Sequence, residues 1–374
     1  MGFLPKTMGA RPRLACEIRA EGVVAVRAED SDAALSAAER VALVNGLAAN
    51  GTARAERVSA VKRALDGAGG RGREVTLVVP DSAARVLLID FDELPAKASE
   101  ALPVVRFRLK KLLPFDADDA AVSYQVMAET RGAIQVLAVA MAREVLAEYE
   151  SLVREAGYEP GAVLPSTLAA LAGLDGDAAP ALVVNAGRDS VTTAIVKDGV
   201  LLLHRTVDLG AGEAMTAAIP AATPEPPEQN SGEVARDTSI AAIAARFAAM
   251  EGQTTPAPRA PEAPVVSRVS STLVSGMAGQ SAAVSEAVDA RRAVAPAEEI
   301  AQAVNVATAY FEDTLQMQPR VILSAGPLGA EALARMLGAG SPQVEEMVNN
   351  GMLDAGVSGV PVGWLAGVRG ALKS

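Results

Sequence analysis

The sequence contains little of what several classes of protein need. One cysteine, Cys16, in 374 residues excludes an internal disulfide framework and makes a reducing cytoplasm the natural setting. One histidine, His204, excludes a histidine-based metal site or a relay of histidines. No apolar run reaches the roughly 18 residues of a membrane-spanning helix, and the opening residues, MGFLPKTMGARPR, lack the apolar core of a signal peptide. We therefore expect any membrane role to go through a partner.

A strongly basic surface is also missing. The formal net charge is −11 and the isoelectric point is near 4.9, which argues against nucleic acid as a partner because phosphate binding needs a basic surface. Hydrophobic residues make up 50% of the chain but aromatic residues only 3%, which indicates helix-rich packing around a modest sheet. The length allows two or more cores and favours a bilobal or multidomain protein.

The most informative stretch is 102–127, which predicts a helix, a stop and a strand. An apolar stripe at helical spacing is formed by Leu102, Val105, Leu109 and Leu112, and the other faces carry Arg106, Arg108, Lys110 and Lys111. Pro114 ends this helix. A strand is then predicted from the alternation of Val122, Tyr124 and Val126 with polar residues.

The flanks of this stretch complete a unit. The β-branched run 74–79 predicts a strand before the helix, and the turn at Gly132 leads into another at 134–139. The order strand, helix, strand, strand resembles the SHS2-type subdomain inserted into actin-like proteins such as FtsA and the PilM family of type IV pilus assembly proteins. Three segments are similar to the PilM family specifically: VPDSAARVLLIDFDELP at 79–95, RFRLKKLLPFD at 106–116 and AVSYQV at 121–126.

The rest of the chain fits the same resemblance. A hairpin is predicted at 14–27 around Gly22, helical patterning at 33–65, a helix at 143–156, and three strands from Ala181 to Val207 with an Asp198-Gly199 turn. Ser166 is expected to cap the helix that it begins. Proline, alanine and serine dominate 218–298, where we expect a disordered insertion with a short helix at 239–250. A helix at 297–317, a strand at 321–323 and a helix at 328–337 follow.

The resemblance covers about 14–210 and 297–372. It implies an α/β actin-like (ribonuclease-H-like) two-lobed fold with an inserted SHS2-type subdomain and a long disordered insertion. The expected divisions are 1–73 for the start of the first lobe, 74–141 for the inserted subdomain, 142–180 for the completion of the first lobe and the crossover, 181–217 for the strands of the second lobe, 218–298 for the insertion, and 299–374 for the completion of the second lobe.

Actin-like proteins bind nucleotide between their lobes, and the resemblance implies ATP and Mg²⁺ as cofactors at three elements. The phosphate hairpin here contains Glu17 and Arg19, and the arginine stands where backbone should approach a phosphate. The second element is Asn185-Ala186-Gly187, which keeps Gly187 but has lost the carboxylate that would hold hydrated Mg²⁺. The adenosine turn is reduced to Ser324-Ala325-Gly326.

Loss of a metal-holding carboxylate should be severe for phosphoryl transfer. We therefore expect no hydrolysis, no catalytic residues and no other metal site. Three interpretations stay open for the three elements: a degenerate nucleotide site that binds without turnover, ordinary turn residues at strand ends, and, disfavoured by the lost carboxylate, a working ATP site.

The remaining polar candidates receive simpler interpretations. His204 is interpreted as structural, Cys16 as a buried inert thiol, Trp364 as core, and the aspartates after Pro114 as solvated turn residues. The basic helix face, Arg106, Arg108, Lys110 and Lys111, is either solvated or a surface for acidic lipids or a membrane protein.

For function, the resemblance implies a cytoplasmic adaptor peripheral to the inner membrane, part of the type IV pilus assembly complex. Its partner would be the cytoplasmic tail of a PilN-type single-pass membrane protein, bound in a groove between the first lobe and the inserted subdomain, with the cytoplasmic pilus motor as a further partner. The alternatives are an ATP-dependent conformational switch of the same complex and a GspL-like component of type II secretion.

Overall fold

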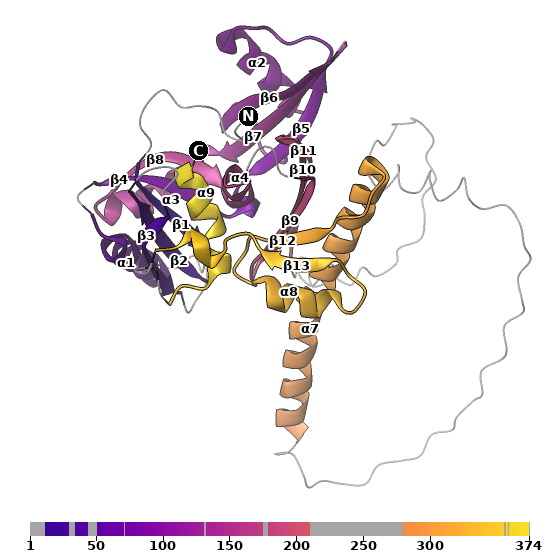
Figure 1. The fold of residues 1–374 in the computed structure, drawn as a ribbon. Helices are drawn as coiled ribbons and strands as arrows, with labels where there is room; N and C mark the ends of the chain where they lie inside the picture. Colours follow the sequence, from indigo (N-terminus) through magenta and orange to yellow (C-terminus); the bar gives the residue numbers. More distant parts are fainter. Residues whose placement is uncertain are drawn as a thin grey trace, which may run out of the picture. The chain divides into compact units, whose positions relative to one another are not determined.

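The computed structural model describes residues 12–29, 34–43, 51–70, 72–130, 132–174, 179–209, 280–354, 357 and 359–373. Most of the predicted insertion at 218–298, and the predicted helix at 239–250, lie outside these residues. The backbone of 280–298 is helical and belongs to α7, Gln280–Leu315, so this helix begins within the predicted insertion. Residues Met1–Ala214 and Asp289–Ser374 form one compact unit, whose elements are labelled in Figure 1.

The first sheet, with the helices that cover it, forms what we call the first lobe. It has the order β3-β2-β1-β4-β8, with bounds Leu14–Arg19 for β1, Gly22–Ala28 for β2, Leu35–Ala42 for β3, Glu74–Val79 for β4 and Glu159–Pro165 for β8. The predicted hairpin is confirmed: β1 and β2 pair antiparallel, whereas β1, β4 and β8 run parallel. Helices cover both faces, so β1 is buried along its whole length.

Two predictions in this lobe are wrong. The segment 35–42 is the strand β3, paired with β2, and the helix α1 begins only at Gly51 and ends at Ala68. The pairing partner decided the conformation, because LSAAERVA has no strong strand propensity of its own. The strand at 74–79 does not open the inserted unit, since it pairs with β1 and β8 in the first-lobe sheet.

The inserted unit is a separate sheet of three strands in the order β5-β7-β6. Its elements are β5 Arg85–Phe91, α2 Ala98–Leu109, β6 Ala120–Thr130 and β7 Ala133–Ala142. Helix α2 packs on one face of it through Ala101, Val105 and Leu109. Leu112, predicted to belong to this apolar stripe, lies beyond the helix end and is half exposed.

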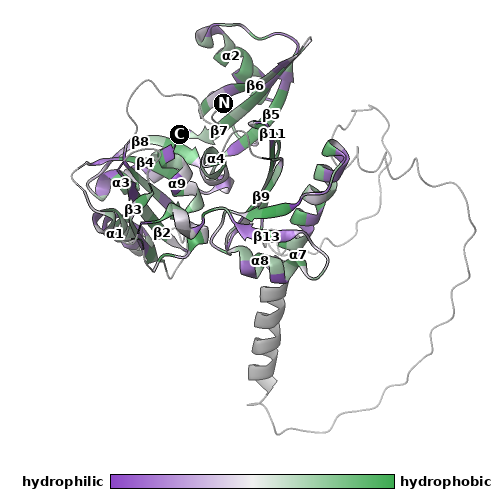
Figure 2. Ribbon diagram, viewed as in Figure 1, coloured by the Kyte–Doolittle hydropathy of each residue, from purple (hydrophilic) through white to green (hydrophobic). Residues whose placement is uncertain are grey.

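The second lobe repeats the plan of the first, with the order β11-β10-β9-β12-β13. Its strands are β9 Ala181–Ala186, β10 Ser190–Lys197, β11 Val200–Asp208, β12 Val321–Ser324 and β13 Gln343–Glu346. Again three antiparallel strands are followed by two parallel ones. The Asp198-Gly199 turn is confirmed, with φ of 52° and 73°, and in Figure 2 most strands are hydrophobic while the edge strand β13 is hydrophilic.

The hydrophobic cores lie between the helices and the two five-stranded sheets. On the first sheet, α1 and α3 (Arg143–Glu155) pack on one face, and α4 (Ser166–Ala172) and α9 (Ala366–Lys373) on the other. On the second sheet, α7 and α8 (Ala330–Leu337) pack on one face. The core around α4 and α9 includes residues of both sheets, so it joins the lobes. Trp364 is buried in it, as predicted, beneath the guanidinium of Arg40.

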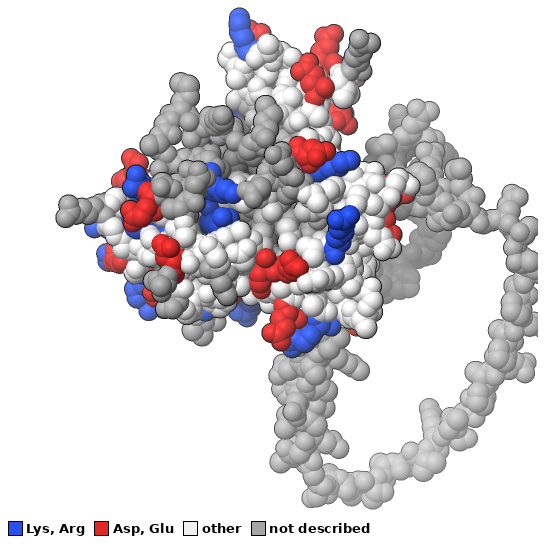
Figure 3. Space-filling view, in the orientation of Figure 1, with Lys and Arg blue, Asp and Glu red and all other residues white. Residues whose placement is uncertain are grey.

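Surface and membrane properties agree with the composition. Acidic and basic side chains lie interspersed on the face shown in Figure 3. Among the described residues, none of the helices has the length and apolar character that crossing a bilayer requires.

Candidate functional site

The ends of the central strands β1 and β9 meet in a buried polar cluster that joins the two lobes. Arg19, 7% exposed, extends from the end of β1. Its Nε donates to Glu17 Oε1 at 2.6 Å, and its Nη2 donates to Ser166 Oγ at 2.6 Å and Asn185 Oδ1 at 2.9 Å. One guanidinium thus binds oxygens from β1, α4 and β9.

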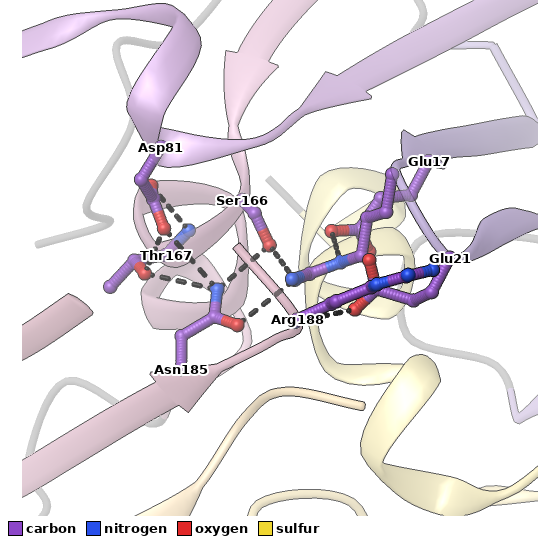
Figure 4. Close-up of polar contacts among 8 residues, drawn as sticks. Glu17, Glu21, Asp81, Ser166, Thr167, Asn185 and Arg188 are labelled. Atoms are coloured by element: carbon purple, nitrogen blue, oxygen red, sulfur yellow. Dashed lines mark hydrogen bonds and ion pairs between the residues drawn. The ribbon is translucent and has the colours of Figure 1, made fainter. Parts of the chain in front are cut away.

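Asn185 continues the cluster on its other side. Its Nδ2 donates to Ser166 Oγ at 2.9 Å, Thr167 Oγ1 at 3.1 Å and Asp81 Oδ2 at 3.3 Å. Asp81 also accepts from the backbone N and the hydroxyl of Thr167, at 3.0 and 2.6 Å. Figure 4 shows Asn185 pointing between these three side chains.

Local structure explains why Ser166 and Thr167 are there. Both begin α4, directly after the parallel strand β8, so they lie at the carboxyl end of the first sheet. The structure overturns the predicted capping role of Ser166, because Pro165 holds the N-cap position without a side-chain cap. The Ser166 hydroxyl instead accepts from Arg19 and Asn185 and is also a hydrogen-bond partner of Glu17.

Burial sets the protonation of the cluster. Burial raises the pKa of Glu17; Arg19 and the Ser166 hydrogen bond oppose this shift, and the negative charge of Asp81 adds to it. Burial lowers the pKa of His204, against the attraction of Asp81. The His204 Nε2 lies 3.9 Å from Asp81 Oδ1 and has no hydrogen-bond partner among the described residues. A neutral, structural imidazole follows, as the sequence predicted.

The predicted nucleotide residues divide into two groups. Glu17, Arg19 and Asn185 come together, and Gly187 lies beside them: a Cβ there would be 2.9 Å from Glu21 Oε1 and 3.3 Å from Arg19 Nη1. A further contact between the lobes runs from the Arg188 backbone N to Glu21 Oε1, at 3.2 Å.

Ser324 and Gly326 form the second group and are packed against neighbouring atoms of the second lobe. Ser324 is buried at the end of β12. A Cβ on Gly326 would lie 2.4 Å from the Ala186 carbonyl and 2.7 Å from Asn185 Oδ1, so the glycine permits close approach to β9.

Sequence reasoning missed Asp81, Thr167 and the true role of Ser166. Asp81 follows the end of the parallel strand β4 after Pro80, and Thr167 follows the end of β8. A polar residue just beyond a β-branched run is the signal that could have found them, since carboxyl ends of parallel strands share one edge of the sheet.

The cluster does not fit Mg²⁺ bound to a nucleotide. Hydrated Mg²⁺ needs oxygen ligands, mainly carboxylates, and here the oxygens of Glu17, Ser166 and Asn185 are taken by a guanidinium. In the part of the chain that the structure describes, no group of three or more Asp, Glu, His or Cys side chains is arranged to hold a metal.

A second feature is a cavity of about 260 Å³ between the first lobe and the inserted sheet. Its walls come from β6, β7, α3 and β8: Ala121, Val122, Ser123, Val139, Met141, Leu146, Glu150, Gly161, Val163 and Pro165. Both β6 and β8 are edge strands of their sheets. Glu150, the one charged lining residue, already pairs with Arg154 at 2.8 Å, so the cavity is largely apolar.

The four basic residues around α2 are not equivalent. Arg106 donates to the carbonyls of Ala117 and Ala120, and Lys110 pairs with Asp118 at 2.6 Å. The side chains of Arg108 and Lys111 are exposed and make no hydrogen bond or ion pair with described residues. Three large hydrophobic side chains beside them are also exposed: Phe107 by 69%, Leu112 by 50% and Val104 by 38%.

No family model and no curated protein matches the sequence. Among solved structures, the PilM-PilN type IV pilus biogenesis complex matches with a TM-score of 0.62 at 18% identity, over 96% of this chain and 98% of that chain. The cytoplasmic domain of EpsL, from the type II secretion system of Vibrio cholerae, has a TM-score of 0.37 at 16% identity, over 64% of this chain and 95% of that one. The ethanolamine utilization protein EutJ of Carboxydothermus hydrogenoformans has a TM-score of 0.41 at 10% identity, over 98% and 91%. The chain therefore has the two-lobed actin-like α/β fold, in the form found in the PilM-PilN structure.

Proposed function

We propose that this chain is a cytoplasmic adaptor of a type IV pilus assembly complex at the inner membrane. It binds the cytoplasmic tail of a single-pass PilN-type protein in the cavity between β6 and β8, and it works without nucleotide hydrolysis. The likeness in fold to the PilM-PilN structure supports this choice of partner. The cytoplasmic pilus motor is a further partner in this proposal.

The observation that carries the proposal is the pair of free strand edges facing one apolar cavity. The outer edge of β8 and the outer edge of β6 have no paired strand among the described residues. Unpaired strand edges invite the addition of a strand, and a neighbouring apolar cavity gives specificity for alternate side chains of an extended peptide. An extended tail with apolar residues fits this chemistry.

The exposed face of α2 supports a location at the membrane surface. Phe107, Val104 and Leu112 provide apolar area, and beside it lie the side chains of Arg108 and Lys111, which have no partner among the described residues. Aromatic and aliphatic side chains flanked by basic ones suit an anionic bilayer surface. We propose that α2 contacts anionic lipids while the tail is bound.

Fluorescence anisotropy with a labelled synthetic peptide of the tail of the PilN-type protein from the same genome tests the adaptor role. Ser123→Trp places bulk in the cavity from an exposed position on β6, and we expect at least a tenfold loss of peptide affinity. Thr130→Trp, exposed on the same strand but outside the cavity lining, is the matched control and should bind as the wild type does. Equal binding by both variants, or no binding by the wild type, would contradict the proposal.

A further inference from the structure

We propose that Arg19 is a resident cation. Its guanidinium fills an oxygen-lined cage between the lobes, at the strand ends where the resemblance implies phosphate and Mg²⁺, and it holds the lobes together without either. The proposal extends the degenerate site of the proposed function and does not depend on peptide binding in the cavity.

The cage is defined by the oxygens around the guanidinium. They come from three elements: Glu17 on β1, Ser166 at the start of α4, and Asn185 at the end of β9, at 2.6, 2.6 and 2.9 Å. A guanidinium is planar and offers several donors in a fixed fork, so it can bind several oxygens at once where an ammonium ion acts as a point charge. The contact between β1 and β9 is therefore made by the cation itself.

Charge balance makes the cation necessary. Two carboxylates of the cluster are buried, Glu17 at 1% exposed and Asp81 at 4%. His204 beside Asp81 is neutral because burial lowers its pKa. Arg19 is thus the one positive charge among the described side chains of the cluster, and buried carboxylates without a cation are strongly unfavourable.

The backbone of helix α9 packs closely against this cage at Gly367. A Cβ on Gly367 of α9 would lie 2.9 Å from Glu17 Oε2 and 3.2 Å from Ser166 Oγ. Helix α9 thus closes over the carboxylate, and the guanidinium occupies the remaining space at the strand ends. A phosphate with its metal would have to displace Arg19 from all three oxygens.

Chemical rescue of the full chain tests whether the cage binds a guanidinium as such. Arg19→Ala should melt at a lower temperature than the wild type. Guanidinium chloride at about 10–50 mM should then raise its melting temperature by about 2–4 °C, because a ligand that binds only the folded state stabilises it. Sodium chloride at the same ionic strength should not. The wild type should gain nothing from guanidinium, and neither should the double variant Arg19→Ala with Glu17→Gln, which lacks the anionic wall.

The result that overturns the proposal is an Arg19→Ala protein whose melting temperature responds to guanidinium no differently from the wild type. Should Arg19→Ala fail to fold, Arg19→Lys and Arg19→Gln decide. The proposal requires the cationic variant to be the more stable of the two, and equal melting temperatures, or a more stable glutamine variant, would refute it. Peptide anisotropy on the same variants separates this question from the adaptor role.

Discussion

Arg19 and Asn185 stand 166 positions apart in the sequence, and the Arg19 Nη2 atom donates to Asn185 Oδ1 at 2.9 Å. The two residues lie on β1 and β9, which hold the same central position in two sheets of the same strand order. One buried hydrogen bond therefore links the two halves of the fold at equivalent points.

The pair formed by Arg19 and Glu17 should behave as a unit. Removing one partner of a buried ion pair so that a charge stays buried alone costs about 3–5 kcal/mol. Arg19→Met leaves Glu17 without its cation and should lower the free energy of unfolding substantially in urea denaturation, whereas Glu17→Gln keeps a neutral side chain of the same shape and should lower it less. The double variant should lose clearly less than the sum of the two. Arg63→Met, at an exposed position of α1, is the control and should change little. Additive losses would show that the pair is not coupled.

The stability of the protein should depend on pH through Glu17. Its pKa is raised above the ordinary value of 4.5, so the folded protein holds this proton more tightly than the unfolded chain does. Glu17 therefore favours folding below pH 4.5, and this contribution is lost as the pH rises through the folded pKa. Relative to Glu17→Gln, the wild type should lose stability as the pH rises from 4.5 through the folded pKa of Glu17.

Urea denaturation of both proteins across this pH range measures the difference, in which the other titrating groups cancel to first order. His204 acts in the opposite direction: its lowered pKa costs stability as the pH falls below its ordinary 6.5. A difference between wild type and Glu17→Gln that does not change with pH would contradict the assigned shift of Glu17.

Packing between α4 and α9 should tolerate no side chain at Gly370. A Cβ there would lie 1.9 Å from the Ala169 carbonyl and 3.0 Å from the Gly173 nitrogen, and backbone atoms cannot rotate away. Gly370→Ala should therefore destabilise by about 1–3 kcal/mol despite the better helix propensity of alanine. The matched control is Gly72→Ala, because no atom lies within 4 Å of a Cβ at that position. Comparable thermal stability of the two variants would contradict the close helix approach.

The exposed face of α2 should give weak, salt-dependent binding to anionic vesicles. Sedimentation with phosphatidylcholine vesicles, with and without phosphatidylglycerol, measures it. Phe107→Ser, and Arg108→Gln combined with Lys111→Gln, should each reduce the bound fraction, since each basic residue contributes about 1 kcal/mol at an anionic surface. Tyr310→Ser removes an exposed aromatic side chain from α7 and should have no effect. Loss of binding in the control, or unchanged binding by the α2 variants, would contradict the surface assignment.

Local patterns predicted most elements of the fold. The Asp198-Gly199 hairpin, the α3 face with Tyr149, Leu152 and Val153, and the strands β6 and β7 follow from periodicity and turn chemistry. The strand β3 could not be predicted in this way, because the pattern of LSAAERVA is typical of a helix and the segment becomes a strand by pairing with β2. Likewise, only the pairing of β4 with β1 and β8 shows which sheet it joins.

The site was partly predictable for a similar reason. Glu17, Arg19 and Asn185 were found because each sits at a strand end that the resemblance singles out. Asp81 and Thr167 were missed because both contact Asn185, which lies 104 positions after Asp81 and 18 positions after Thr167. No local sequence pattern encodes such contacts. The sequence predicted that Arg19 would hinder the approach of a phosphate. Its hydrogen bonds to Glu17, Ser166 and Asn185 are visible only in the structure.

The most direct test of the account is calorimetric titration of the full chain with the tail peptide, with and without Mg·ATP, after titration with Mg·ATP alone. We expect peptide binding with the same affinity in both conditions, and no heat from Mg·ATP up to millimolar concentrations, because Arg19 holds the oxygens that a metal-bound phosphate would need. Saturable binding of Mg·ATP, or a peptide affinity that changes when it is present, would contradict the account and favour an ATP-dependent switch.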